Sequence, residues 1–292
     1  MELYKLYNPI TATPFACDET YAEYAPCEAL KPYIKCFWGS RMPYRQEKTE
    51  CPTKGIIIPD TCVDIIFNID FTRNQIYSSF CGIDDASFLT HKTPEEGIVS
   101  TFAIRFYVWS VALFAEDSMK GTINGFFDAD CYFSRLKREL MPLLFTVASM
   151  EERISIAQRL LLKHMRTRDI NSVIRDAVGE LLLEKGRVEI GQLSKEIHIS
   201  TRQMERLFQE YMGISPKKLG ELIRYQYLWH DIVYNPRFHV LDAVHKYGYT
   251  DQAHLLHQFK RFHTMTIPEA RAYALKDVGF LQEKSCESGM LL

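Results

Sequence analysis

The sequence lacks the features by which several large classes of protein are first identified. Its N-terminal stretch, MELYKLYNPI, has no basic segment followed by an apolar core, and no apolar run reaches the roughly 18 residues of a membrane-spanning helix. Neither an export signal nor a transmembrane span is therefore expected, and the sequence predicts a cytoplasmic protein without membrane contact. The formal net charge of −2 provides no global basic field that would by itself indicate nucleic-acid binding.

Closely spaced cysteines are also missing. The eight Cys residues form no C-x-x-C pair, and disulfide frameworks belong mostly to short secreted chains, so reduced thiols are expected. The alternative is a thiolate metal or redox sensor, which requires an exposed and electropositive cysteine. Its candidates fall on or near predicted strands: Cys36, Cys51, Cys62 and Cys81.

Patterns typical of catalysis are scarce. Only His91 and His164 precede residue 168, which nearly excludes a His-rich metal site in the first half of the chain. The sequence contains no Gly-rich loop for phosphate and no defensible pairing of a nucleophile with a base. It therefore predicts a protein that is not an enzyme and carries no cofactor or metal.

The first half of the sequence has the pattern of short β-strands. Residues 1–30 are interrupted by prolines and are expected to be irregular, whereas strand-like stretches follow between residues 33 and 107. Residues 62–71 alternate as a half-buried strand does, with Val63, Ile65, Phe67 and Ile69 on one face. Several such strands separated by turn residues predict a small antiparallel barrel or sandwich.

Helical periodicity begins near residue 108. A short helix closed by Gly121 is expected first, then an amphipathic helix over 128–140 that ends near Pro142. A third helix starts at Ser149, which forms a capping-box pattern with Glu152. Helices within residues 130–166 are candidates for a dimer interface; the alternative is that they pack on the barrel.

The polar segment at 165–169 predicts a domain boundary. We expect an α+β protein with an N-terminal sensing or dimerisation domain over 1–166, with strands at about 33–107 and helices at about 108–166. An all-α domain over 168–277 and a flexible tail over 278–292 follow. The second domain carries 16 Lys and Arg against 14 Asp and Glu, so charge alone does not decide whether it binds DNA.

Two similar pieces occur between residues 189 and 274, and each predicts a short helix, a tight turn and a second helix. In the first piece, Ser200 caps the second helix with Gln203 at the capping-box position, and Gly213 ends it. In the second piece, Gly248 supplies the turn and Thr250 or Asp251 the cap. A long helix between them is expected to hold both pieces in a fixed relation.

The second helix of each piece, near 201–212 and 251–263, would enter the major groove of DNA at positions about one helical turn apart. Its outward residues are then the candidate DNA contacts, with arginines suited to guanine and the basic pair at 260–261 suited to phosphate. These residues are Thr201, Arg202, Glu205, Arg206, Gln252, Ala253, Leu256, His257, Lys260 and Arg261. The alternative is a helical bundle whose polar residues are merely solvated.

Residues 168–276 resemble the paired helix-turn-helix domain of the AraC/XylS family of bacterial transcription regulators. The residues that carry this resemblance are Leu193-Ser194, Ile197, Ser200, Met204, Arg206, Phe208, Gly213-Ile214-Ser215-Pro216, Ile223-Arg224, Gly248-Tyr249, Asp251-Gln252, His254-Leu255, Gln258-Phe259-Lys260, Glu269 and Arg271. The resemblance implies a DNA operator, a small-molecule effector, a homodimer and contact with RNA polymerase. It also implies a cupin-like N-terminal sensor domain, and PDTCVDIIFNID together with FAIRF resembles a sensor found in some members.

The second piece departs from the family pattern at four positions. Thr264 stands where the family usually has Gly, Ile267 where it has Pro, Ala270 where it has Tyr, and His257 where Arg is common. The first three are expected to loosen the end of this piece, and His257 to alter its base contact. The first piece, with Arg202 and Arg206, is expected to carry more of the specificity.

Candidate ligand contacts in the N-terminal domain are Trp38, Cys62, Asp64, Arg105 and Tyr107. Asp64 and Arg105 lie on strand faces opposite the apolar one and would flank a polar ligand. The alternatives are a structural ion pair or two solvated side chains for this pair, and a core position for Trp38. Two further classes stay open: a regulator that accepts an alkyl group on a zinc-bound cysteine, which the scattered cysteines disfavour, and a constitutive DNA-binding protein with a purely structural N-terminal domain.

Overall fold

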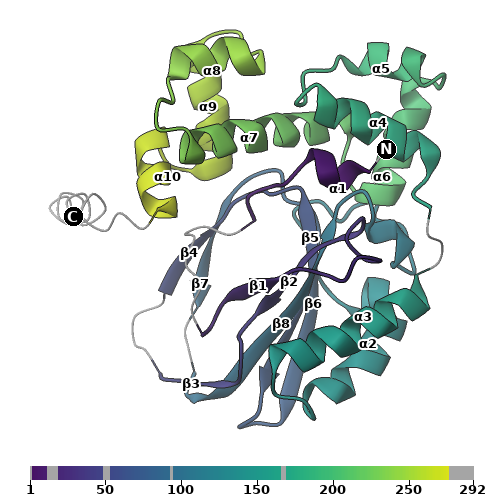
Figure 1. The fold of residues 1–292 in the computed structure, drawn as a ribbon, viewed down its shortest axis with the longest axis vertical. Helices are drawn as coiled ribbons and strands as arrows, with labels where there is room; N and C mark the ends of the chain where they lie inside the picture. Colours follow the sequence, from purple (N-terminus) through teal and green to yellow (C-terminus); the bar gives the residue numbers. More distant parts are fainter. Residues whose placement is uncertain (1, 12–18, 49–52, 93–94, 166–168, 276–292) are drawn as a thin grey trace, which may run out of the picture.

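The computed structural model describes residues 2–11, 19–48, 53–92, 95–165 and 169–275. It consists of an N-terminal antiparallel sheet with flanking helices and a C-terminal group of helices (Figure 1). The predicted α+β architecture is confirmed at this level, whereas the cupin-like character of the sheet stays a prediction. The boundary predicted at 165–169 and the tail at 278–292 fall largely or wholly outside the described residues. Within the described ranges, no helix combines the length and apolar character needed to cross a bilayer.

The larger sheet has the strand order β1-β2-β8-β5-β6-β9, with β3 also paired to β8, and β4 and β7 form a second sheet. Every pair is antiparallel. The strands are β1 Ala22–Tyr24, β2 Ile34–Gly39, β3 Tyr44–Gln46, β4 Thr53–Ile57, β5 Cys62–Asp70, β6 Gln75–Cys81, β7 Phe88–Lys92, β8 Gly97–Tyr107 and β9 Phe126–Asp128.

The central strands β5 and β8 form the middle of the larger sheet. The predicted alternation in β5 is confirmed, since Ile65 and Phe67 are fully buried whereas Asn68 is exposed. In β8 both faces are buried from Phe102 to Tyr107, which alternation alone did not indicate. The register places Asp64 directly opposite Arg105, so two charged residues meet inside this part of the sheet.

Two predictions for local elements are wrong. Residues 1–30 contain the helix α1 (Leu3–Leu6) and the strand β1, which exist because they pack against α4 and pair with β2. The segment 108–121 holds only the 3-10 turn η1 (Val111–Leu113) in place of an α-helix, since Ser110 bonds the carbonyls of Tyr33 and Tyr107. The second predicted helix is present as α2 (Asp130–Leu144) and ends two residues after Pro142, with Leu140 and Leu144 buried.

Helix α3 (Met150–His164) packs beside α2 against the sheet (Figure 1). Its predicted cap is present, with Ser149 accepting the Glu152 N–H at 3.3 Å. Arg153 is fully buried, where burial lowers its pKa to about 10, and it joins α3 to β8 through Ser100 Oγ at 2.5 Å. Packing on the sheet is thus observed for α2 and α3, and their role in dimerisation stays a prediction.

The C-terminal part consists of seven helices within the described range 169–275. They are α4 Ser172–Leu183, α5 Ile190–Glu196, α6 Thr201–Met212, α7 Pro216–Tyr234, α8 Val240–Tyr247, α9 Gln252–His263 and α10 Ile267–Ala274. The connecting helix α7 has 19 residues and is about 28 Å long. Figure 1 shows it running between α5–α6 at one end and α8–α9 at the other, above the sheet.

The connecting helix is fixed to the N-terminal segment by polar and aromatic contacts. Gln226 of α7 donates to the carbonyl of Pro59 at 2.7 Å and accepts the N–H of Ile10 at 2.9 Å. Tyr227 donates to the carbonyl of Leu6 at 3.2 Å, and its ring lies 5.6 Å from that of Tyr7. The buried amide of Gln226 is thus satisfied by backbone groups of the N-terminal half of the chain, which attaches α7 to that half.

Candidate nucleic-acid interface and junction cavity

The first helix-turn-helix unit consists of α5 and α6. Ser200 Oγ accepts the Gln203 N–H at 3.2 Å, and Gly213 ends α6 with a φ of 73°, the left-handed conformation that glycine adopts most readily. Ser194 of α5 bonds Thr201 at 3.0 Å and so fixes the angle between the helices. Thr201, Arg202 and Arg206 are exposed on α6, and Glu205 is half-buried beside them.

The second unit consists of α8 and α9. Asp251, one of the two predicted caps, accepts the His254 N–H at 2.7 Å, and Gly248 makes the turn with a φ of 66°. All six predicted contact residues of α9 are exposed: Gln252, Ala253, Leu256, His257, Lys260 and Arg261. Both units therefore present a 12-residue capped helix with an open polar face.

The two units end differently. Thr264 takes the left-handed C-cap position of α9 with a φ of 59°, where α6 has Gly213. After it, Thr266 and Glu269 form a capping box that starts α10, and Pro268 lies in the first turn of that helix. The departures at 264 and 267 thus lie in an ordered cap and an ordered helix start, and whether they loosen the unit stays a prediction.

Several residues of the family pattern serve the interior of the helical domain. Arg224 of α7 lies over the ring of Tyr249 at 4.7 Å and donates to Gln258 of α9 at 3.3 Å. His263 is completely buried, bonds Tyr225 at 2.6 Å, and has a pKa lowered by burial to about 3. These contacts attach α9 to α7 and fix the orientation of its exposed face.

One exposed basic residue of α9 is engaged by the N-terminal domain. Arg261 Nη2 lies 3.4 Å from Oδ2 of Asp85, a buried residue in the loop after β6, and Lys218 of α7 binds the same oxygen. Asn124 donates to Asp85 Oδ1 at 2.7 Å. These cations and the Asn124 hydrogen bond hold the pKa of Asp85 below its usual value despite its burial. Sequence reasoning did not find Asp85, because the two cations that bind it are over 130 residues away in the chain.

The predicted ligand residues of the sheet are brought together as an ion-pair network. Arg105 makes two bonds of 2.8 Å to the Asp64 carboxylate and a third of 3.0 Å to the carbonyl of Thr11. Trp38 Nε1 donates to Asp64 at 3.2 Å, and its ring lies 5.3 Å from the Arg105 guanidinium. This geometry matches the alternative of a structural ion pair. Cys62 of β5 is paired with Tyr107 of β8, two residues along the strands from the Asp64–Arg105 pair.

Of the thiols in this region, Cys36 and Cys62 are buried and Cys81 is half-buried. Burial raises the pKa values of Cys36, Cys62 and Cys81 above the usual range, which disfavours the reactive thiolate. Cys51, the fourth candidate, lies outside the described residues. Among the described side chains, no three or more His, Cys, Asp and Glu are grouped in a way that could hold a metal ion.

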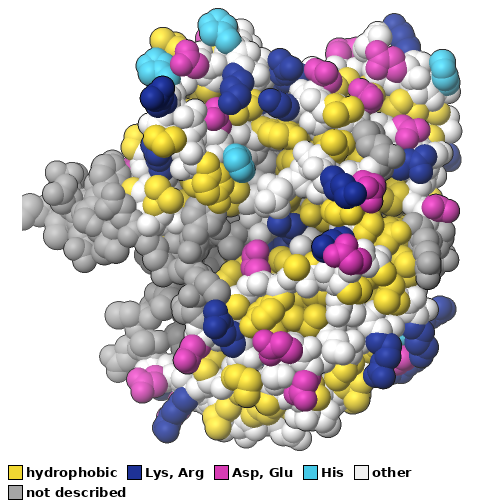
Figure 2. Space-filling model, in the orientation of Figure 1, with side chains coloured by type: hydrophobic (Ala, Val, Ile, Leu, Met, Phe, Trp, Pro, Cys, Tyr) yellow, Lys and Arg dark blue, Asp and Glu magenta, His cyan; other side chains and the backbone are white. Residues whose placement is uncertain are grey.

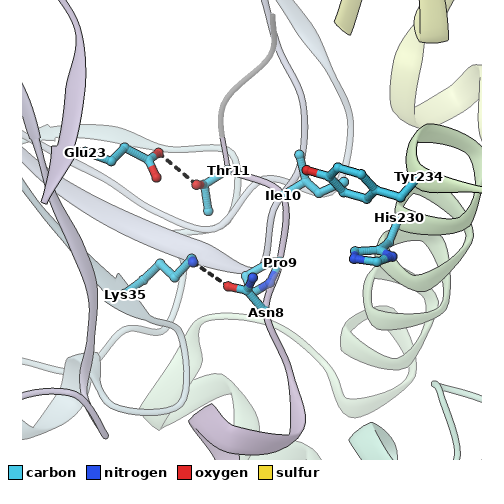
Figure 3. Close-up of a pocket in the computed structure, with 8 residues that line it drawn as sticks. All are labelled: Asn8, Pro9, Ile10, Thr11, Glu23, Lys35, His230 and Tyr234. Carbon is cyan, nitrogen blue, oxygen red and sulfur yellow. Dashed lines mark hydrogen bonds between the residues drawn. The ribbon is translucent and has the colours of Figure 1, made fainter. Parts of the chain in front are cut away.

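A cavity of about 360 Å³ opens where the N-terminal segment meets α7 (Figure 3). His230 and Tyr234 reach it from α7, Lys35 from β2 and Glu23 from β1, and residues 8–11 form its floor. Sequence reasoning missed these residues, since no motif connects them. Lys35 donates to Asn8 at 2.5 Å.

The two charged residues of the cavity, Glu23 and Lys35, differ in whether an opposite charge lies beside them. The Glu23 carboxylate accepts bonds from Thr11 at 2.9 Å and Tyr21 at 2.7 Å, and lies 3.6 Å from Arg105 Nη1. Lys35 has a neutral partner instead, so its positive charge is available to a molecule in the cavity. On the molecular surface, Lys and Arg are interspersed with acidic side chains on the face shown in Figure 2.

Two capped helix-turn-helix units held by one connecting helix define a DNA-binding protein of the paired type. Residues 193–273 match the family model of a helix-turn-helix domain, and residues 22–125 match a domain of unknown function, DUF6597. The C-terminal part is therefore a helix-turn-helix domain, and the chain is a DNA-binding transcription regulator. A comparison with curated proteins found no match.

Solved structures of bacterial transcription regulators share a distant likeness with the chain. A regulator with an AraC-type DNA-binding domain from Chromobacterium violaceum is 20% identical, with a TM-score of 0.32, over 34% of this chain and 89% of that one. ToxT from Vibrio cholerae, with an unsaturated fatty acid bound, is 8% identical, with a TM-score of 0.36, over 78% of this chain and 97% of that one. CdpR from Pseudomonas aeruginosa is 13% identical, with a TM-score of 0.31, over 60% and 46%. Scores this low carry no argument about ligand or mechanism.

Proposed function

We propose that the protein reads a specific DNA operator through α6 and α9 and that a small molecule bound at the domain junction modulates this binding. The observation that supports DNA reading is the pair of capped 12-residue helices with exposed polar faces at the two ends of α7. Their spacing along a connecting helix of about 28 Å is compatible with two major-groove segments one helical turn apart. The protein would act as a homodimer without catalysis, and contact with RNA polymerase would follow from DNA binding.

Base reading is assigned mainly to the first unit. Arg202 and Arg206 are exposed, and Arg206 lies 4.0 Å from Glu210, a distance that leaves its guanidinium available. In the major groove a bidentate arginine contributes about 1–3 kcal/mol of discrimination for guanine. On α9, His257 is the corresponding exposed residue and offers fewer hydrogen-bond donors.

Arg206→Ala is expected to reduce affinity for the selected operator roughly 5- to 150-fold, which corresponds to the loss of about 1–3 kcal/mol of base discrimination. Affinity for mixed-sequence DNA is expected to fall much less. In vitro selection with the full-length protein, followed by titration of the selected and mixed duplexes, measures both effects. His257→Ala serves as the matched control on α9 and is expected to cost less. An equal loss on both duplexes would contradict base reading by Arg206.

The effector is assigned to the junction cavity in preference to the Asp64–Arg105 network. The cavity joins β1 and β2 to the end of α7 that leads into the second unit, so an occupant touches both parts of the molecule (Figure 3). The Arg105 guanidinium, by contrast, is already bonded to Asp64 and Thr11. We expect an effector with a polar group that accepts from Lys35.

A thermal-shift screen of metabolites with the full chain tests this site. A true effector is expected to raise the melting temperature of the wild type by several degrees at saturating concentration and that of Lys35→Gln by clearly less. Lys31→Gln is the matched control, because Lys31 is a partly exposed residue that is paired with Glu28 and does not line the cavity. Equal shifts in all three proteins would rule out the cavity, and DNA affinity unchanged by every compound would favour a constitutive regulator.

A further inference from the structure

The loop between β6 and β7 reaches the DNA-binding domain through a single buried carboxylate. Asp85 is 7% exposed, and its Oδ2 binds Lys218 of α7 and lies 3.4 Å from Arg261 of α9. Both cations belong to the helical domain, and the carboxylate belongs to the sheet domain. We call these three residues the Asp85 cluster.

The loop is built to hold this carboxylate in place. Asn124, itself in a left-handed turn with a φ of 53°, donates to Asp85 Oδ1 at 2.7 Å and accepts the Asp85 N–H at 2.9 Å. Both oxygens of Asp85 are thereby used, one by Asn124 and one by the cations. A carboxylate bonded on both oxygens is positioned before its partners arrive, which makes the contact specific to this site.

Arg261 is partly withdrawn from DNA by this arrangement. It is a predicted phosphate contact on the exposed face of α9, and besides Asp85 its guanidinium lies 3.7 Å from Glu221 of α7. Both carboxylates compete with a phosphate for the same nitrogens. The side chain is still 41% exposed, so DNA can reach it once Asp85 is displaced.

We propose that the Asp85 cluster is an autoinhibitory contact, in which the N-terminal domain neutralises Arg261 and Lys218 and thereby weakens phosphate binding by the second unit. The proposal rests on the proposed DNA contact of α9. It predicts that removing the negative charge of Asp85 strengthens DNA binding, whereas a carboxylate that merely positions Arg261 for DNA would have the opposite effect.

Asp85→Asn is the direct test, since an amide oxygen can still accept the bond from Asn124. With the full-length protein and a mixed-sequence duplex at low salt, we expect affinity to rise about 10-fold. We also expect the slope of log K against log salt concentration to steepen by roughly one to two, because each recovered phosphate contact adds about 0.9. Thermal unfolding shows whether the variant keeps its fold.

Two controls separate the contact from a general change in charge. With every titration carried out at pH 8, above the pKa of about 7 to which burial raises Asp84, Asp84→Asn makes nearly the same charge change one residue away. Its electrostatic neighbours are Asp60, Asp64 and Asp85, and the variant is expected to alter DNA affinity less than twofold. In an Arg261→Ala background, Asp85→Asn should lose most of its effect on affinity and on the salt slope.

Each result decides between the possibilities. Equal gains from Asp84→Asn and Asp85→Asn, or a gain that persists in full with Arg261→Ala, would overturn the proposal in favour of bulk charge. A loss of affinity in Asp85→Asn would show that Asp85 positions Arg261 for DNA. If Asp85→Asn has no effect while Arg206→Ala still abolishes operator preference, the inhibitory contact alone is wrong; if the wild type binds no duplex, both proposals fall.

Discussion

At the scale of single residues, α6 and α9 both end in a left-handed backbone conformation, which glycine adopts in one helix and threonine in the other. Gly213 and Thr264 both take left-handed C-cap positions, with φ values of 73° and 59°. For a residue with a Cβ this conformation costs roughly 1–2 kcal/mol, and branching at Cβ adds to the crowding. Thr264 recovers part of that cost through a bond of 2.6 Å from its hydroxyl to the carbonyl of His263.

Thr264→Gly is therefore expected to stabilise the protein by about 1 kcal/mol, because glycine adopts this conformation without the steric cost. Denaturant unfolding of the full chain provides the measurement. Gly213→Ala is the matched variant of opposite sign, since a Cβ at 213 would lie 2.6 Å from the carbonyl oxygen of Met119 in the neighbouring domain. Lower stability of Thr264→Gly would show that the hydroxyl bond outweighs the backbone strain.

Local residue chemistry explains which single positions could be predicted. Ser200, Asp251 and Ser149 were identified as caps because a cap depends on residues three or four positions away, and the observed bonds agree. Asp85 and Arg153 were missed because their partners come from distant strands and helices. A buried charge can be interpreted only when the residues that compensate it are known.

At the scale of elements, the length and periodicity of a segment decide whether its secondary structure could be predicted from the sequence. The amphipathic helices α6 and α9 were expected within a few residues, and the paired arrangement of helices around α7 followed from their repeats. The short elements α1, β1 and η1 were not, because three or four residues carry too little periodicity and are stabilised by tertiary contacts.

The connecting helix shows the same limit within one element. The sequence predicts α7 as a long helix that holds both units, but it does not show that the amide of Gln226 bonds the backbone of Ile10 and Pro59. Those bonds attach α7 to the N-terminal segment, next to the residues that line the junction cavity. The candidate DNA residues thus follow from the helical repeat, whereas the cavity and the Asp85 cluster depend on how two domains meet.

At the scale of the whole molecule, buried titratable groups give the two domains opposite responses to acid. Burial lowers the pKa of His263 in the helical domain to about 3, against about 6.5 in an unfolded chain. The contribution of neutral, buried His263 to the free energy of unfolding is therefore fully present above pH 6.5 and is lost as the pH falls towards 3.

Burial, with neighbouring carboxylates, raises the pKa of Asp84 in the sheet domain to about 7, against about 3.9 in an unfolded chain. Ionised Asp84 therefore destabilises the fold above pH 7, and protonation relieves this as the pH falls towards 4.

Asp84→Asn and His263→Phe are accordingly expected to change stability with opposite pH dependence. Asp84→Asn should stabilise the protein at pH 8 by about 2 kcal/mol, and the gain should shrink by pH 5, where Asp84 of the wild type is already protonated.

His263→Phe leaves the Tyr225 hydroxyl without its partner and should cost about 1–3 kcal/mol of stability at pH 8. That loss should narrow by about 2 kcal/mol at pH 5, because the wild type then carries the cost of keeping His263 neutral. Urea unfolding at both pH values measures the four differences, and parallel curves for either variant would show that its site does not govern the acid response of its domain.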